Sequence, residues 1–361
     1  MSDTTMSDTT ETHPEQQLQL GLDTFGDITV DTGGRPVSHA QSIRNVVEQG
    51  VLADELGLDV FAVGEHHRAD FAVTAPEVVL AAIAGRTSRI RLGSAVTVLS
   101  SDDPVRVYER FATLDALSHG RADIILGRGS FTESFPLFGY DLADYELLFE
   151  EKIALFAELL KEQPVTWSGQ TRAALTAQPV YPPTESGALT TWVGVGGSPE
   201  SVVRAARYGL PLLLAIIGGE PLRFAPYVDL FKRALAQFDR PLLPVGAHSP
   251  GHIAATDAQA RDELWPPYSV MQQRIGAERG WSPMTREQFD REAGPDGAIF
   301  VGAPETVAAK IVKVARGLGL SRFDLKFSNG TMAHERLLES IRLYGREVAP
   351  MVREQLAAPV K

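Results

Sequence analysis

Cysteine is absent from the 361 residues of this chain. Its absence excludes disulfides, thiolate nucleophiles, iron–sulfur clusters and cysteine-based zinc sites. The segment Glu65-His66-His67 does not replace them as a metal site, because adjacent strand residues point to opposite faces and no carboxylate set completes a metal shell. We therefore expect no bound metal. A chain without disulfides fits a reducing cytoplasm.

Basic residues are also scarce, with 34 Lys and Arg against 46 Asp and Glu and a net charge of −12. An acidic surface repels nucleic acid and anionic lipid, so we expect neither a nucleic-acid nor a membrane partner. The longest apolar run, Leu210–Ile217, is too short to cross a bilayer. Residues 1–17 are polar, repeat the pentapeptide MSDTT and lack the regions of a signal peptide, so we expect a disordered tail.

Short apolar segments alternate with segments of helical periodicity from residue 18 to residue 355. The expected strands cover residues 18–23, 59–64, 90–99, 122–126, 190–195, 210–217, 242–248 and 322–327. Eight such repeats predict one α/β domain, a (β/α)8 TIM barrel, with insertions at about 167–186 and 280–297. A doubly wound open sheet is the alternative, but GxGxxG is missing after the first strand.

Unusual residues gather where the expected strands end, which is where barrel enzymes carry their active sites. They include Phe25-Gly26-Asp27, Glu65-His66-His67, Gly127-Arg128-Gly129, Gly196–Ser201 and His248-Ser249. This clustering predicts a large, extended ligand at that end of the barrel. One histidine of the 65–67 segment is a candidate for proton transfer or hydrogen bonding there.

The segment Gly196–Ser201 joins a strand to a helix and is the candidate phosphate site. The free N–H groups and the dipole of a helix N-terminus favour an anion, and the Ser198 and Ser201 hydroxyls can add hydrogen bonds. Simple capping of the helix by Ser198 is the alternative. Both readings stay open from the sequence alone.

Gly127, Arg128 and Gly129 follow the fourth strand. The glycines allow close approach of a ligand, and the guanidinium suits a phosphate or a polar ring edge. Aromatic residues that can form an apolar wall or lid for a substrate are Phe25, Phe131, Phe135 and Phe138. The two insertions are candidates for covering loops. A strand, a tight turn and a patch of core explain the Gly127 segment equally well.

Four segments, taken in order, resemble the bacterial luciferase-like flavin-dependent monooxygenases. They are EHH at 65–67, IRLGSAVTVLSSDDPVRVYERFATLDALSHGRADIILGRG at 90–129, SFTESFPLFGYD from 130, and VGVGGSPES from 193. The resemblance runs from about Leu20 to the closing helix. It implies a (β/α)8 barrel that uses reduced FMN as a co-substrate, with a coenzyme F420 branch. In FMN members a flavin peroxide oxidises the substrate, here expected to be small and apolar. A flavin reductase as the source of reduced FMN and a homodimer are implied too.

The resemblance also assigns residues. It implies catalysis by His66 with its neighbour His67. It implies cofactor contacts by Ala95, Val96, Gly127, Arg128, Gly129, Tyr145, Val195, Gly197, Ser198 and Ser201. The Ala95–Val96 peptide matches one that is cis in the family. Tyr145 stands near a missing phosphate-binding arginine, and we expect its hydroxyl to substitute. Ser134 replaces an aspartate of light-emitting members, so bioluminescence is not expected.

Three other functions stay open. An F420-dependent oxidoreductase would transfer hydride without O2. A non-catalytic flavin-binding protein would hold the cofactor without turnover. A sugar-phosphate barrel enzyme ranks last, because the expected phosphate loops after strands seven and eight are missing.

Overall fold

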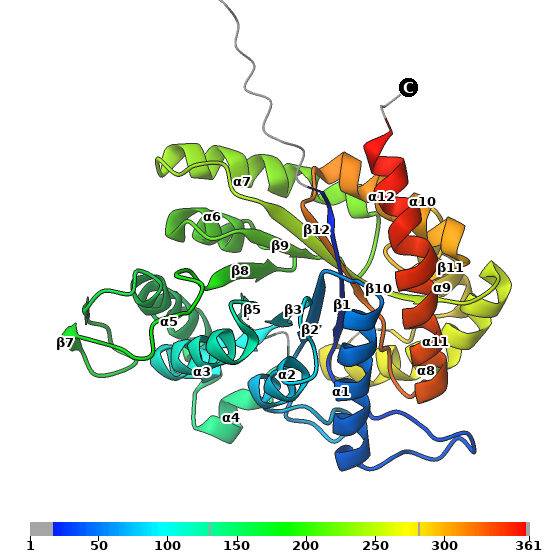
Figure 1. The fold of residues 1–361 in the computed structure, drawn as a ribbon, viewed down its shortest axis with the longest axis horizontal. Helices are drawn as coiled ribbons and strands as arrows, with labels where there is room; N and C mark the ends of the chain where they lie inside the picture. Colours follow the sequence, from blue (N-terminus) through cyan, green and yellow to red (C-terminus); the bar gives the residue numbers. More distant parts are fainter. Residues whose placement is uncertain (1–16, 130, 281, 359–361) are drawn as a thin grey trace, which may run out of the picture.

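The computed structural model describes residues 17–129, 131–280 and 282–358. The expected disordered tail, 1–17, falls outside them except for Gln17. Within these residues, eight parallel strands form a closed ring in the order β1-β2-β3-β5-β8-β9-β10-β12, and β12 pairs back onto β1. They are β1 Gln19–Thr24, β2 Val60–Val63, β3 Arg91–Ser94, β5 Ala122–Gly127, β8 Thr190–Val195, β9 Leu212–Ala215, β10 Val245–Ile253 and β12 Arg322–Lys326. The (β/α)8 prediction is confirmed (Figure 1).

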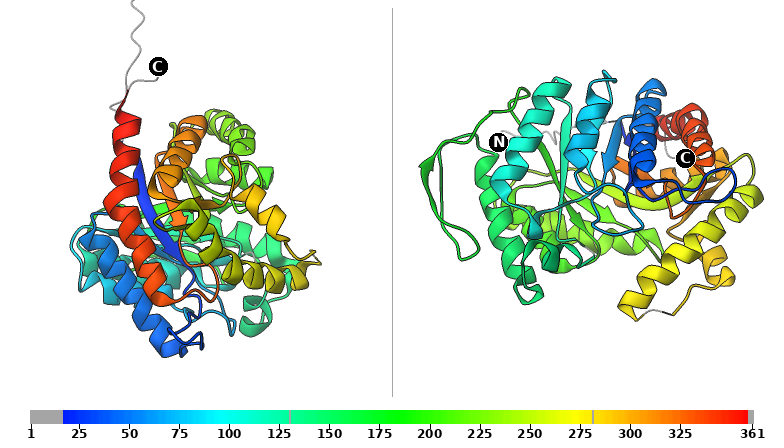
Figure 2. Two further views of the ribbon diagram at one scale, coloured as in Figure 1. Left: turned by 90° about the vertical axis from the view of Figure 1, so that its right-hand side faces the viewer. Right: turned by 90° about the horizontal axis from the view of Figure 1, so that it is seen from below.

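Helices surround this ring on its outer side (Figure 2). They are α1 His39–Glu55, α2 Pro76–Ala84, α3 Pro104–Ser118, α5 Tyr145–Leu159, α6 Pro199–Tyr208, α7 Ala225–Gln237, α8 Asp257–Arg279, α10 Pro304–Leu318, α11 His334–Leu343 and α12 Ala349–Ala357. Several begin at a residue that suits a helix start: the Ser38 side chain accepts the Gln41 N–H, and Pro76 and Pro104 each open a helix. Along the described chain, no helix is long and apolar enough to span a membrane.

Short elements fill the connections. They are β4 Thr97–Val98, β6 Val165–Trp167, β7 Leu175–Gln178, β11 Phe300–Gly302, α4 Ser134–Phe138 and α9 Arg286–Glu292, with 3-10 turns at Leu99–Ser101, Leu142–Asp144 and Pro221–Phe224 and a π turn at Tyr344–Val348. The third expected strand is thus divided, because the chain leaves the sheet at Ala95–Val96 between β3 and β4. The seventh extends to Ile253, where it pairs with β11.

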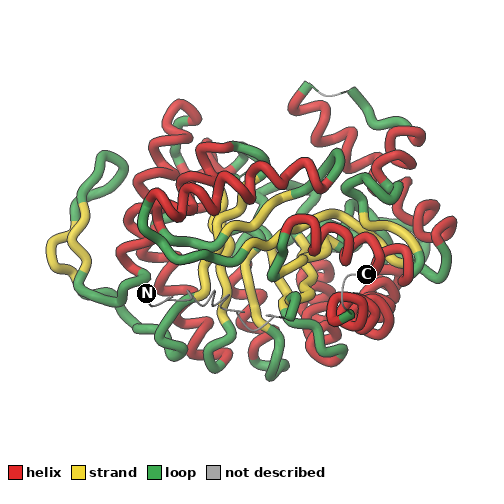
Figure 3. Tube along the Cα trace, turned by 90° about the horizontal axis from the view of Figure 1, so that it is seen from above, coloured by secondary structure: helices red, strands yellow, loops and turns green. Residues whose placement is uncertain are grey.

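The first insertion forms the antiparallel hairpin β6–β7, which projects sideways beyond the ring of helices (Figure 3). It is fastened to α5, where the Glu151 carboxylate accepts the N–H groups of Gln170 and Thr171. The second insertion contains α9. No described residue of either insertion lines the main cavity, and their role as covering loops stays a prediction.

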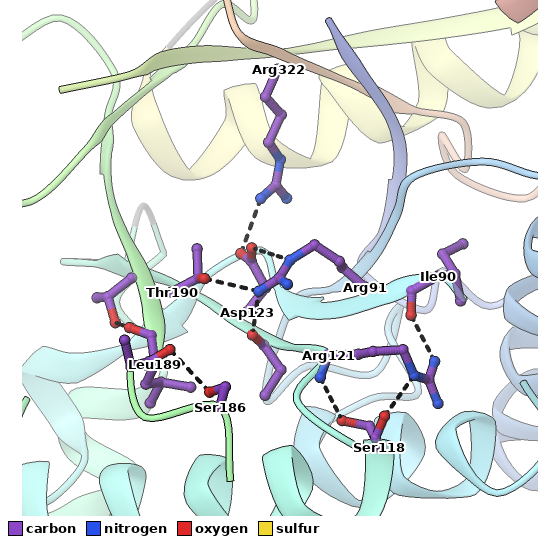
Figure 4. A network of polar contacts seen from close by, with 12 residues as sticks. Ile90, Arg91, Ser118, Arg121, Asp123, Ser186, Leu189, Thr190 and Arg322 are labelled. Atoms are coloured by element: carbon purple, nitrogen blue, oxygen red, sulfur yellow. Dashed lines mark hydrogen bonds and ion pairs between the residues drawn. The ribbon is translucent and has the colours of Figure 1, made fainter. Parts of the chain in front are cut away.

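Ion pairs occupy the amino-terminal end of the barrel interior, next to a small apolar cluster that includes Ile125, Trp192 and Leu213. Arg322 on β12 is fully buried and reaches across to Asp123 on β5 at 3.0 Å (Figure 4). Its Nη2 lies 2.7 Å from Oδ2 of Asp324. Arg91 adds a hydrogen bond of 2.9 Å to the Thr190 hydroxyl. These side chains close the barrel at this end, so the free volume lies at the other end.

Candidate active site

A cavity of about 510 Å³ lies at the carboxyl ends of the barrel strands. Residues following seven of the strands and one face of α8 line it. Its lining includes eleven residues that the sequence predicts: Phe25, His66, Ala95, Val96, Gly127, Arg128, Gly129, Phe131, Tyr145, Gly197 and Ser198. Sequence segments far apart in the chain therefore do meet at one site.

Five predicted residues do not line it. Val195 belongs to the apolar core, because strand alternation turns Gly194 and Gly196 toward the cavity instead. His67 lies 3.4 Å from the Glu65 carboxylate and against the ring of Phe138, which is half exposed on α4. The remaining two are buried: Phe135 stacks beneath Tyr145, and Ser201 lies in the first turn of α6. Phe135 and Phe138 therefore do not line the cavity, and their substrate or lid role stays a prediction.

His66 enters the cavity with a carboxylate behind it. Its Nδ1 lies 3.1 Å from Oε1 of Glu133, and a carboxylate can only accept, so Nδ1 carries the proton. Burial alone would raise the pKa of Glu133, but the His66 hydrogen bond and nearby Arg68 bring it below its ordinary value. The Phe71 and Phe131 rings lie 4.6 Å from the imidazole. The sequence missed Glu133, which stands in the loop after the fourth strand.

Glycines make room for the Ala95–Val96 segment, whose peptide bond is cis as the resemblance implies. A Cβ on Gly127 would lie 2.4 Å from Cγ2 of Val96, and one on Gly194 would lie 3.2 Å from Cγ1. A Cβ on Gly64 would lie 2.4 Å from the Ala95 oxygen. The β-branched Val96 therefore fits between two strand ends that carry no side chain. Gly64 and Gly194 were not predicted, because single strand glycines carry no specific signal.

The N-terminus of α6 faces the cavity beside Gly197 and Ser198. The Ser198 Oγ accepts the Ser201 N–H at 3.3 Å and donates to Glu200 at 2.8 Å, so capping does occur. The Ser201 hydroxyl is buried and has no partner among the described residues. Capping and anion binding are compatible here, and the phosphate role of this loop stays a prediction.

Two arginines lie next to this helix end. Arg128 forms an ion pair with Glu146, and Arg204 on α6 donates to the same carboxylate at 3.1 Å. The Tyr145 hydroxyl donates to the Gly129 oxygen at 2.9 Å, so its proton points to the backbone. Arg204 therefore adds a second positive charge at Glu146, beside the position where the resemblance implies a phosphate-binding arginine. Its position inside a helix gave no sequence signal.

The opposite wall carries a second histidine that was not assigned a role. The Nδ1 of His248 lies 2.7 Å from Oδ2 of Asp23, which is fully buried. Lys326 donates to the Ser328 oxygen, and its ammonium lies 4.5 Å from the centre of the Phe25 ring. Phe25 stacks against His248 at 6.3 Å and contacts His66 edge-on at 5.0 Å. One aromatic ring thus separates two histidines that each have a carboxylate partner.

We compared the sequence and the fold of this chain with those of known proteins. The family model of luciferase-like monooxygenases matches residues 24–322. The chain belongs to this family. Among its curated relatives, N-acetyl-S-alkylcysteine monooxygenase of Bacillus subtilis (strain 168) is 30% identical over 61% of this chain and 63% of the relative. The alkanal monooxygenase alpha chain of Photobacterium leiognathi is 30% identical over 50% of this chain and 51% of the relative. The chain thus spans between half and two thirds of the length of these two relatives.

Solved structures share the luciferase-like fold over nearly the whole chain. The monooxygenase RslO1 from Streptomyces bottropensis has a TM-score of 0.76 at 23% identity, over 92% of this chain and 99% of its own. The oxygenating constituent of 3,6-diketocamphane monooxygenase from Pseudomonas putida, in complex with FMN, has a TM-score of 0.74 at 17% identity, over 92% and 98%. A coenzyme F420 dependent tetrahydromethanopterin reductase from Methanopyrus kandleri has a TM-score of 0.69 at 18% identity, over 92% and 99%.

Proposed function

We propose that this luciferase-like protein is a flavin-dependent monooxygenase that uses reduced FMN and O2 to oxidise a small apolar molecule. The observation that carries the proposal is one cavity that joins a histidine with a carboxylate partner, a glycine-flanked Ala95–Val96 segment and the N-terminus of α6. Each part suits a different portion of a flavin or its substrate. Membership of the luciferase-like family supports the same reaction class.

The chain offers a fitting place for the cofactor. Gly127 and Gly194 leave open the strand ends beside Val96, where a flat ring could lie. The buried hydroxyl of Ser201 and the guanidiniums of Arg128 and Arg204 are near the same helix end, where a phosphate would be favoured. When bound, reduced flavin supplies the electrons and the activation of O2.

The protein's own contribution is to bind, orient and exclude water. Phe25, Phe71 and Phe131 surround His66 with apolar rings and restrict water on that side. Glu133 holds the imidazole through Nδ1, so Nε2 is the atom that can hold or pass a proton in the cavity. An imidazole ring held in one orientation and surrounded by apolar side chains suits an oxygenation site.

An F420-dependent hydride transfer is the second candidate, favoured by the fold it shares with the Methanopyrus kandleri reductase. A third is flavin binding without turnover. A separate flavin reductase as the source of reduced FMN, a homodimeric state and a cytoplasmic location belong to the proposal as well. They follow from the family resemblance and the composition.

The test is anaerobic titration with reduced FMN, followed by mixing with O2 and a panel of apolar ring and chain compounds. We expect saturable binding of reduced FMN, and O2 uptake matched by oxygenated product for at least one compound. Reduced F420 in place of FMN is the control, and it should support neither O2 uptake nor substrate reduction. Binding of reduced FMN without product from any compound would favour a non-catalytic flavin protein. Product formed only with F420 would overturn the proposal.

A further inference from the structure

One face of α8 forms a wall of the cavity and carries a single polar pair among apolar side chains. The residues of this face that line the cavity are Tyr268, Met271, Gln272 and Ile275. Their spacing is that of neighbours on one side of a helix. A close contact holds α8 at the strand ends, because a Cβ on Gly330 in the loop after β12 would lie 2.6 Å from the Pro267 oxygen. None of the residues assigned to the cofactor lies on α8, so this wall is left for the substrate.

The polar pair consists of Tyr268 and Gln272, one helical turn apart. The Gln272 Nε2 lies 2.9 Å from the Tyr268 hydroxyl oxygen. Tyr268 is 1% exposed, and its ring packs against Phe289 of α9 at 5.8 Å between centroids. Burial raises the pKa of Tyr268 to about 12, so its hydroxyl keeps the proton at neutral pH, where a side-chain amide is uncharged too. The pair is therefore fixed in place and carries no charge.

The pair has more hydrogen-bonding capacity than its internal bond uses. A phenol donates one proton and accepts through its oxygen, and an amide has two N–H protons and a carbonyl oxygen. With the Gln272 N–H donating to the hydroxyl, the Tyr268 proton and the amide oxygen remain; with the amide turned round, its N–H groups and the phenol oxygen remain. Within the described residues, neither side chain makes another hydrogen bond. One donor and one acceptor are therefore left in either orientation of the amide.

The apolar surroundings make these remaining groups selective. Met271 and Ile275 continue the same wall with side chains that offer no N–H or O–H. A polar group shielded from water costs free energy unless a partner is supplied, so a ligand with both partners binds more tightly than an apolar ligand of the same shape. A few fixed polar groups on an apolar wall also orient the ligand.

Gln272 also borders a second pocket, of about 310 Å³, lined by residues of α8, α9 and the segment between them. Two charged residues of opposite sign line this pocket as well, and both have partners. The Glu292 carboxylate accepts the Gly219 N–H at 2.9 Å, and Arg291 donates to Glu287. A ligand group bound by Gln272 therefore lies at the boundary of the two pockets, next to no uncompensated charge. This setting favours an uncharged group.

We propose, resting on the proposed function for the statement that a small substrate enters this cavity, that Tyr268 and Gln272 together bind one uncharged group of the substrate that both donates and accepts a hydrogen bond. The substrate class is a mainly apolar compound with a hydroxyl or a carboxamide group. Its oxygen accepts a proton from one member of the pair, and its O–H or N–H donates to the other. No covalent step is involved.

The test measures the binding of three probes with the same ring system to the full chain at pH 7 without flavin, by isothermal titration calorimetry. The hydroxyl of 2-naphthol donates and accepts, 2-methoxynaphthalene only accepts, and 2-methylnaphthalene does neither. We expect 2-naphthol to bind about tenfold more tightly than 2-methylnaphthalene, with the methoxy compound between them. Equal binding of 2-naphthol and either other probe, or binding of none, would overturn the proposal.

Variants then assign the preference to the pair. Tyr268→Phe removes only the hydroxyl, and Gln272→Met keeps the side-chain length without the amide. Each should reduce the affinity ratio of 2-naphthol to 2-methylnaphthalene, and the double variant should bring it to about one. The matched control is Met271→Leu on the same face, which should keep the tenfold ratio. A change of cavity shape alone alters the affinity for all probes together and leaves the ratio unchanged.

An unchanged ratio in both single variants or in the double variant would place the preference at another polar group of the cavity and overturn the proposal. These measurements need neither reduced FMN nor O2, so they separate from the oxygenation test. Hydroxyl preference without oxygenation of any compound would count against the proposed function and keep this binding site. Oxygenation without hydroxyl preference would keep the function and overturn the role of Tyr268 and Gln272.

Discussion

Lys310 shows how a single buried residue controls stability in this protein. It lies on α10, and its ammonium donates to the backbone oxygens of Gly294 and Ile299, each at 2.7 Å. Burial lowers the pKa of Lys310 to about 7. The folded state therefore loses this proton near neutral pH, whereas the unfolded chain, with an ordinary lysine, keeps it until about pH 10.

The sign of the resulting pH dependence follows. Between about pH 7 and 10 the unfolded state binds more protons than the folded state, so stability rises with pH in this window. Going from pH 7 to 9, Lys310 should add about 2 kcal/mol to the free energy of unfolding. Lys310→Met removes this contribution, and urea unfolding at both pH values measures it. An equal change with pH in both proteins would contradict the assignment.

At the residue scale the sequence also located His66 correctly on the cavity but not the carboxylate behind it. Glu133 is 67 positions away along the chain. Asp23 and His248 are 225 positions apart. Which carboxylate meets which histidine depends on the ring order of the strands, which no local pattern encodes.

The covering role expected of the hairpin β6–β7 stays a prediction. Its proline-rich and polar sequence suggested a cover over the ligand, but the hairpin packs on α5 through Glu151 and stays outside the cavity lining. Loops after a barrel strand cover a site only when they turn inward over the strand ends, and composition does not give that direction.

Replacing residues 168–177 by a short Gly-Ser linker tests this placement. We expect the affinity for reduced FMN to stay within about twofold of wild type, because no described hairpin residue lines the cavity. The matched control is Gly127→Ala, whose Cβ would lie 2.4 Å from Val96 and which should weaken flavin binding at least tenfold. Anaerobic titration measures both. A tenfold loss in the hairpin variant would support the lid interpretation.

At the scale of the whole molecule, the barrel interior holds ion pairs at the amino-terminal ends of its strands and the cavity at their carboxyl-terminal ends. Arg322 links β12 to β5 across the barrel axis and leaves the carboxyl-terminal end free for the cavity. Its two partners, Asp123 and Asp324, are buried. Removing the guanidinium leaves Asp324 without its cation and leaves Asp123 with Arg91 alone, at 3.5 Å.

Arg322→Met should therefore lower the free energy of unfolding by about 3–5 kcal/mol. The control is the double variant Arg322→Met with Asp324→Asn, which removes one orphaned charge and should be less destabilised than the single variant. Denaturant unfolding followed by circular dichroism gives both values. A double variant that is less stable than the single one would show that the charges are not the cause.

The sequence by itself determined the repeating strand–helix order, the family and most of the cavity-facing segments. Those features are local: periodicity fixes each element, and residues at parallel strand ends must come to the same edge. The extent of the single domain, 18–355, stays a prediction. Only the tertiary structure decided that Val96 fits between Gly127 and Gly194, that Arg204 joins Arg128 at Glu146, and that Asp23 meets His248. The physical reason is that barrel closure and side-chain packing, rather than neighbouring residues in the chain, choose these partners.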